Sequence, residues 1–152
     1  MQTPQDLLQM CLNILRQIGR NLFMRLFPVI LTGRGSEFSN PLAIELGKDL
    51  DDVLWTKVFY CDPNSPFQKG AIEVNHELIR RIITKGKTFD NFTQDKIDRM
   101  MNHINSYSRK KLGNKTSYEI FKYIYGEETV QKLNLKPIKS DGVMIHPRLL
   151  QD

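Results

Sequence analysis

The residues with the clearest potential for chemistry surround one carboxylate, Glu73, in a segment with helical spacing. Lys69 precedes Glu73 by four residues and shares its helix face, and Gly70 leaves the turn before the carboxylate without a side chain. A carboxylate beside a cation, with an open approach, could bind a divalent metal ion that also contacts phosphate. The same spacing is typical of a surface ion pair, and the local pattern by itself favours this simpler interpretation.

Basic side chains accompany this carboxylate along the chain. They fall into two groups, Lys69, Arg80, Arg81, Lys85 and Lys87 on or just after the helix and Arg109, Lys110 and Lys111 in a later loop. With 22 Lys and Arg against 17 Asp and Glu, the formal net charge is +5, which favours a polyanionic partner without establishing one. For each residue the alternative is an ordinary solvated surface.

The composition is that of an ordinary globular protein. Of 152 residues, 40% are hydrophobic and 26% are charged, which predicts about one domain and excludes wholesale disorder. No apolar run approaches the ~20 residues that cross a bilayer, and the N-terminus lacks the pattern of a signal peptide. Two cysteines, Cys11 and Cys61, are too few for a disulfide scaffold, so we expect buried thiols and a cytoplasmic location.

Helices and two strands are predicted before the Glu73 helix. The patterns place helices at 4–18 and 21–26 and strands at 27–32 and 57–61, the first strand being buried. Residues 39–56 look irregular, and their acidic cluster of Asp49, Asp51 and Asp52 is interpreted as a solvated loop. An isolated strand pair is marginally stable and leaves its edges unpaired, so we expect both strands to belong to a larger α/β sheet whose other strands lie upstream.

The remaining chain is predicted to be mostly helical. Helices are expected over 66–84, with Ile72, Asn75, Ile79 and Ile83 on one face, and over 93–107, with Ile97, Met100, Met101 and Ile104 as its apolar stripe. Thr116 and Glu119 form a capping box ahead of a short aromatic helix, and residues 134–152 look extended. His76, His103 and His146 lack metal-ligand spacing and are interpreted as surface or packing residues.

Four segments together resemble one family of enzymes, the DDE transposases of insertion sequences, and most closely those of the IS-thirty type. The segments are LTGRGSEF at 31–38, VFYCDP at 58–63, QKGAIE at 68–73 with its continuation to Lys85-Gly86, and NSYSRKKLG at 105–113 followed by TSYEIF at 116–121. Their order and spacing agree with the family pattern over about residues 20–125. Ser108 and Ser117 stand where that pattern usually has prolines.

The resemblance implies a definite chemistry. Such enzymes cut and join transposon-end DNA with three carboxylates that hold two divalent ions, Mg²⁺ or Mn²⁺, on a ribonuclease-H-like sheet. Glu73 matches the third carboxylate and would be both the catalytic residue and the metal ligand. The residues that the resemblance assigns to nucleic-acid binding are Lys69, Asn75, Arg80, Arg81, Lys85, Arg109 and Lys110.

Two departures from the family pattern bear on activity. Gly33 occupies the position of the second Asp, and the first Asp is expected upstream of Met1 together with a helix-turn-helix. Loss of one member of a catalytic unit typically costs several orders of magnitude in rate. Glu37 and Asp62 match acidic positions that look structural in the family, so neither is expected to substitute. We therefore expect a chain that is inactive alone, and whether it is an enzyme stays open.

The sequence thus predicts an α/β protein, a partial ribonuclease-H-like (integrase core) fold that lacks its first strands and is followed by a helical part. Residues 1–88 would form the C-terminal part of the core, 89–133 a helical extension and 134–152 an extended tail. The expected partner is DNA, with no membrane. The alternatives are a non-catalytic module that binds DNA or pairs with an intact transposase or another copy of itself, and a chain that does not fold stably.

Overall fold

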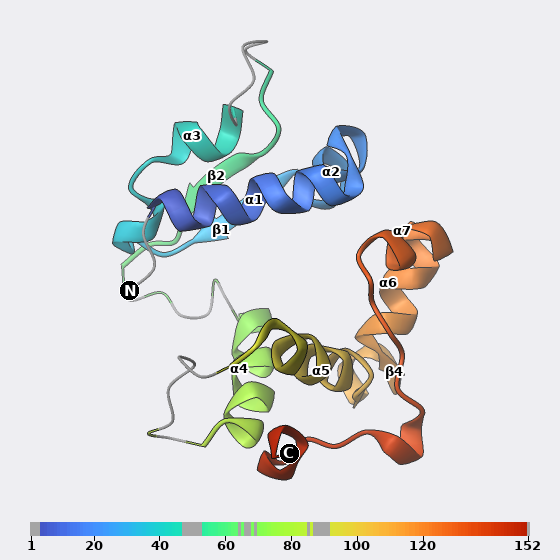
Figure 1. Ribbon diagram of the computed structural model, residues 1–152. Helices are drawn as coiled ribbons and strands as arrows, with labels where there is room; N and C mark the ends of the chain where they lie inside the picture. Colours follow the sequence, from blue (N-terminus) through green and yellow to red (C-terminus); the bar gives the residue numbers. More distant parts are fainter. Residues whose placement is uncertain are drawn as a thin grey trace. The chain divides into compact units, whose positions relative to one another are not determined.

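The computed structural model describes residues 4–46, 53–63, 65, 68, 70–84, 86 and 92–151 (Figure 1). They fall into two compact units, Met1–Lys69 and Gly70–Asp152, and each unit is considered by itself. None of the helices in these ranges combines the length and the apolar character that crossing a bilayer requires. The domain boundary expected near residue 88 stays a prediction.

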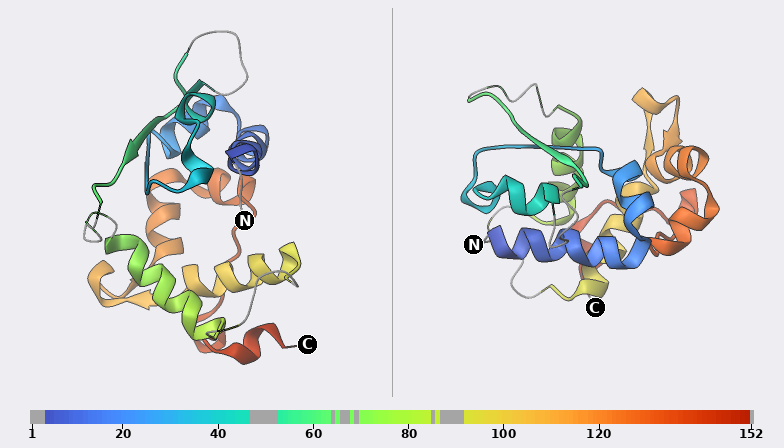
Figure 2. Two further views of the ribbon diagram at one scale, coloured as in Figure 1. Left: turned by 90° about the vertical axis from the view of Figure 1, so that its left-hand side faces the viewer. Right: turned by 90° about the horizontal axis from the view of Figure 1, so that it is seen from above.

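The first unit is built around two short parallel strands. Its elements are α1 (Pro4–Ile18), α2 (Arg20–Leu26), β1 (Val29–Thr32), the 3₁₀ turn η1 (Ser36–Phe38), α3 (Pro41–Leu46) and β2 (Lys57–Tyr60). β1 and β2 pair in parallel, with Val29 opposite Lys57 and Thr32 opposite Tyr60. α3 lies beside β2 and α1 (Figures 1 and 2). Both predicted helices and both predicted strands are therefore confirmed.

The expectation that 27–32 forms a buried strand is wrong. Only Thr32 of β1 is buried, whereas Val29 is 52% and Leu31 43% exposed. Phe59, which pairs with Leu31 on β2, is 52% exposed. Successive strand side chains point to opposite faces of a sheet. One face of the pair is thus left open by the described residues of this unit, and its apolar side chains contact solvent.

The expectation that residues 39–56 are irregular is also wrong, because α3 lies within them. Asn40 accepts a hydrogen bond from the Ala43 N–H at 3.2 Å, and Pro41 takes the first helical position, where its missing N–H costs nothing. Ile44 of α3 is buried, and Glu45 Oε1 accepts the Val58 N–H of β2 at 2.8 Å. The acidic cluster at Asp49, Asp51 and Asp52 lies outside the described residues.

Both cysteines lie in the first unit as buried free thiols, as predicted. Burial raises the pKa of the Cys11 thiol, although a backbone hydrogen bond opposes part of that rise. Cys11 is therefore protonated at neutral pH and packs as a small apolar side chain.

The second unit is a helical assembly with one small hairpin. Its elements are α4 (Gly70–Ile82), α5 (Gln94–Asn105), β3 (Ser108–Arg109), η3 (Lys110–Leu112), β4 (Lys115–Thr116), α6 (Ser117–Tyr125), α7 (Glu127–Lys132), η4 (Ser140–Gly142) and η5 (Pro147–Leu150). β3 and β4 pair antiparallel. The capping box at the start of α6 is confirmed, because the Thr116 side chain accepts the Glu119 N–H and Glu119 accepts the Thr116 N–H. The short helix α7 was not predicted.

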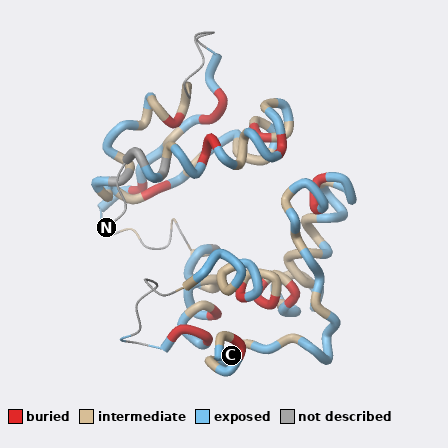
Figure 3. Tube along the Cα trace, viewed as in Figure 1, coloured by how far each residue is buried: buried red, intermediate tan, exposed pale blue. Residues whose placement is uncertain are grey.

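One hydrophobic core holds α4, α5 and the C-terminal turn η5 together (Figure 3). Its buried members are Leu78, Ile82 and Ile83 of the α4 region, Met100 and Ile104 of α5, and Leu149 of η5. The predicted stripe of α5 is thereby confirmed for Met100, Met101 and Ile104, whereas Ile97 is not a member of this core. The predicted stripe of α4 is only partly right, because Ile72 is 40% exposed and its place is taken by Leu78 and Ile82.

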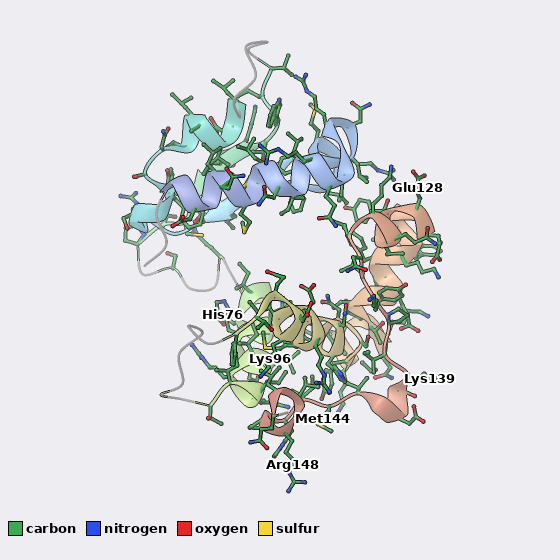
Figure 4. The ribbon with its side chains drawn as sticks, viewed as in Figure 1. His76, Lys96, Glu128, Lys139, Met144 and Arg148 are labelled. Atoms are coloured by element: carbon green, nitrogen blue, oxygen red, sulfur yellow. The ribbon has the colours of Figure 1, made fainter. Side chains whose placement is uncertain are left out.

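The extended tail is fastened to the last turns of α5. The Lys136 N–H donates to Asn102 Oδ1, the Ile138 N–H to Ser106 Oγ, and the Met144 N–H to His103 Nδ1. Burial lowers the pKa of His103, and the charge of Arg99 lowers it further, so the ring stays neutral and accepts the Met144 bond. The exposed side chains of Lys139, Met144 and Arg148 lie along this tail (Figure 4). As predicted, the tail is extended over its described residues 134–151, apart from the turns η4 and η5.

The described part of the chain is thus a mixture of helices with a parallel strand pair, in agreement with the α/β class. The ribonuclease-H-like arrangement stays a prediction.

Candidate nucleic-acid interface

Glu73 lies in the first turn of α4 with an exposed side chain. A side chain placed at Gly70 would meet nothing within 4 Å, so within this unit the turn before Glu73 is open, as expected. Lys69, its predicted partner, lies outside the described residues. In the part of the chain that the structure describes, His, Cys, Asp and Glu side chains form no group of three that could hold a metal ion. The described donors therefore do not fit a two-metal centre.

The positions in the first unit that the resemblance makes relevant lie near the ends of its strands. Gly33 directly follows β1 and is half-buried. Asp62, just after β2, is tied to Gln68 by two hydrogen bonds, one from Gln68 Nε2 to Asp62 Oδ2 and one from the Asp62 N–H to Gln68 Oε1, both 2.9 Å long. Asp62 therefore fixes a turn. The side chain of Glu37 is outside the described set.

Two of the predicted DNA-binding residues contact each other. Arg109 Nη2 of β3 donates a hydrogen bond of 2.7 Å to Asn75 Oδ1 of α4, across 34 positions of sequence. Both side chains are half-buried, and Arg109 Nε is enclosed without a partner among the described groups. This bond joins the Glu73 helix to the basic hairpin. Arg109 and Asn75 are therefore placed to position that hairpin.

A pocket of about 580 Å³ lies between α4 and the segment 107–112. Gly70, Val74, Glu77, Leu78 and Arg81 line it from α4, and Tyr107, Ser108, Arg109, Lys110, Lys111 and Leu112 line it from the other side. Most of the lining surface is apolar, and its charged members are Glu77 and Arg81 of α4, Arg109 of β3, and Lys110 and Lys111 of η3. The pocket is of the size that binds small organic ligands.

The charges around this pocket are mainly positive. Arg81 Nη2 lies 2.5 Å from Glu77 Oε1, and Glu77 raises the pKa of Arg81, so these two charges offset each other. Lys110 and Lys111 are exposed in η3, and no ion pair joins either of them to another described side chain. Arg80 is also exposed on α4, although it does not line the pocket. Net positive charge therefore remains on this face.

Two residues that were not predicted line the pocket, and two predicted residues lie outside the described part of the chain, while the binding roles of all of them stay predictions. Tyr107 and Lys111 line the pocket but were not among the predicted binding residues. The basic run Arg109-Lys110-Lys111 could have indicated Lys111, because Lys111 is its last residue. Nothing in a single sequence indicated Tyr107. Lys69 and Lys85 lie outside the described residues.

Comparison with known proteins identifies transposases and an integrase as relatives of this chain. A Bacteroides fragilis protein, "Transposase for insertion sequence element IS4351", is 32% identical over 105 residues, which are 69% of this chain and 30% of the relative. The Escherichia coli K12 protein "Transposase InsI for insertion sequence element IS30A" is 37% identical over 79 residues, 51% of this chain and 21% of the relative. A "Putative integrase ORF3" of Spiroplasma virus SpV1-R8A2 B is 35% identical over 92 residues, 60% and 27% of the two chains.

The chain is related to the insertion-sequence transposases of the IS30 type. This relationship confirms the resemblance carried by the four sequence segments. The matched part spans about a third or less of the length of these transposases. No family model matches the chain, and no solved structure does.

Removing either partner of the Asn75–Arg109 bond from this chain is expected to destabilise its second unit. Hydrogen bonds to charged groups contribute about 1.5–3 kcal/mol, and partial exposure places this bond near the lower end, at about 1.5 kcal/mol. Asn75→Ala and Arg109→Ala should each lower the free energy of unfolding measured by hydrogen exchange of the α4 amides. The double variant should show a coupling energy of about 1 kcal/mol.

Gln94→Ala is the matched control for this pair. Gln94 Nε2 donates to Asp98 Oδ1 at 2.7 Å on the exposed side of α5. Losing that solvent-exposed bond should change stability by less than about 0.5 kcal/mol. Strict additivity of the Asn75 and Arg109 substitutions would mean that the two side chains do not interact in solution.

Proposed function

We propose that this chain acts in DNA transposition as a DNA-binding part of a transposase and does not cut DNA by itself. The observation that carries the proposal is the exposure of Arg80 on α4 and of Lys110 and Lys111 on η3, with the Asn75–Arg109 bond joining α4 to β3, the strand directly before η3. Cations on a fixed frame bind phosphates and position DNA without reading its sequence. The transposase relatives supply the biological context.

The absence of cutting activity is argued from the carboxylates. In the family pattern the second metal-binding Asp stands where this chain has Gly33, which has no oxygen side chain. Glu73 would remain as the third carboxylate of a ribonuclease-H-like core that uses Mg²⁺ or Mn²⁺. One carboxylate supplies too few ligands to hold two ions, and loss of one member of a catalytic unit removes most of the rate.

A second role, as a partner of intact transposase or of another copy of this chain, is favoured by the open face of the first unit. Val29, Leu31 and Phe59 expose apolar surface on a two-stranded sheet, and each strand has an edge that no described residue of its unit pairs. Such edges pair readily with other chains. Co-purification of tagged chain with an intact transposase of the same element would support this regulatory role.

The primary proposal is tested by two measurements on the full chain. Fluorescence anisotropy with two duplexes of unrelated sequence should show similar affinities that fall with KCl, with a log–log slope of about −2 to −3 for three phosphate contacts. Supercoiled plasmid incubated with the chain in Mg²⁺ or Mn²⁺ should stay closed. No binding at low salt would refute the DNA-binding role, and metal-dependent nicking would refute the absence of cutting.

A further inference from the structure

We propose that the pocket between α4 and residues 107–112 receives one unpaired base of the bound DNA, with the adjoining phosphate at Lys110 and Lys111. This inference rests on the proposed DNA-binding function and goes beyond it, because it assigns a nucleotide to a defined cavity. The pocket lies within the second unit and all of its lining residues are described.

The lining of the pocket matches a flat aromatic group. Val74, Leu78 and Leu112 supply apolar walls, and Tyr107, which is 36% exposed, adds an aromatic ring to the lining. A volume of about 580 Å³ accommodates a ligand of nucleotide size. Bases stack on aromatic side chains irrespective of their identity, because every base has a π-face. A base pair within a duplex cannot enter such a pocket, so the base must be unpaired.

The charges at the opening identify what is attached to that base. Lys110 and Lys111 are exposed and form no ion pair with described side chains, while Glu77 is already paired with Arg81. The pocket is therefore positive where the two exposed lysines line it. A free phosphate would leave the apolar walls uncovered, and an apolar peptide side chain would leave the lysines unmatched. A nucleotide satisfies both requirements.

The turn that carries the lysines is held in place before any ligand arrives. The Gly113 N–H donates to the Lys110 carbonyl at 3.1 Å, and Gly113 has a φ of +64°, a backbone conformation that favours glycine. Ser108 pairs with Thr116, and Arg109 both pairs with Lys115 and bonds Asn75. A preformed site loses little conformational entropy on binding, so stacking appears directly as affinity.

The test compares a blunt duplex with the same duplex carrying a short single-stranded overhang, by fluorescence anisotropy at one KCl concentration. Stacking of one base is worth about 1–3 kcal/mol, so the full chain should bind the overhang about tenfold more tightly than the blunt duplex. Val74→Trp fills the pocket without changing charge and should abolish this preference, so that the overhang and the blunt duplex bind with equal affinity. Ile72→Trp, on the same helix but outside the pocket, is the matched control and should keep the preference.

A second pair of variants guards against misfolding of the filled pocket. Tyr107→Ala should lose the overhang preference, and Tyr107→Phe should retain it, with the circular dichroism spectra unchanged. Equal affinity of the unaltered chain for the two DNAs would overturn the pocket assignment and leave the DNA-binding proposal standing. An overhang preference that survives both Val74→Trp and Tyr107→Ala would also overturn it. Failure to bind either DNA would instead refute the underlying function.

Discussion

Replacing Arg80, Lys110 and Lys111 together with glutamine is expected to weaken duplex DNA binding about 100-fold at roughly 0.1 M KCl. Each phosphate contact releases counterions, and its contribution to log K is about 0.9 per tenfold change in salt concentration. Three lost contacts should therefore also make the dependence of log K on log[KCl] shallower by about 2 to 3. Anisotropy titrations at several KCl concentrations measure both quantities in one series.

The matched control neutralises three exposed cations of the tail in the same unit, Lys136, Lys139 and Arg148, of which Figure 4 labels the last two. Each triple variant lowers the formal net charge from +5 by three, to +2. Long-range attraction therefore falls equally in both, and only local phosphate contacts distinguish them. If the tail variant loses as much affinity as the first, binding follows net charge and the proposed interface is wrong.

Much of the fold was predictable because its signals are local. The capping box at Thr116 and Glu119 and the stripe of Met100 and Ile104 need only nearby residues, and both are confirmed. Asn40 followed by Pro41 was an equally local signal for α3, but Pro41 was interpreted, together with Gly47 and the acidic cluster, as a sign of irregular structure. Nearby residues therefore contained enough information to predict α3, although the prediction for this segment was wrong.

The other wrong predictions concern which face of a helix or strand is buried, and nearby residues do not determine this. Leu78 and Ile82 are buried in place of Ile72 because α5 and Leu149 pack on that side of α4, and Leu149 lies far along the chain. The exposure of β1 likewise depends on what packs against it. A periodic pattern shows that a helix has an apolar face, but the neighbours decide how far around the helix burial extends.

The candidate site was predictable in its residue types and not in its contacts. The basic groups and Glu73 were evident from spacing and resemblance. The bond between Asn75 and Arg109 joins residues 34 positions apart, and a single sequence carries no trace of it. The pocket arises from the same long-range packing, which explains why Tyr107 was overlooked.

The largest expected loss of stability follows from the core that holds this site. Ile104 of α5 is 0% exposed, between α4 and η5. Ile104→Ala removes three buried carbons and leaves a cavity that helices cannot fully close, so it should lower the free energy of unfolding of the second unit by about 2–5 kcal/mol. Hydrogen exchange of the α4 and α5 amides in the full chain measures this loss directly.

Ile72→Ala makes the same chemical change on α4 at a side chain that is 40% exposed, and it should alter stability by less than about 0.5 kcal/mol. Comparing the two variants isolates the effect of burial on stability, because both substitutions remove the same atoms. A loss for Ile104→Ala no larger than that of Ile72→Ala would mean that α4 and α5 do not share this core in solution. The pocket would then lack a fixed wall, since Leu78 belongs to the core and also lines the pocket. The stability of Ile104 packing and the binding of a base are therefore linked through one side chain.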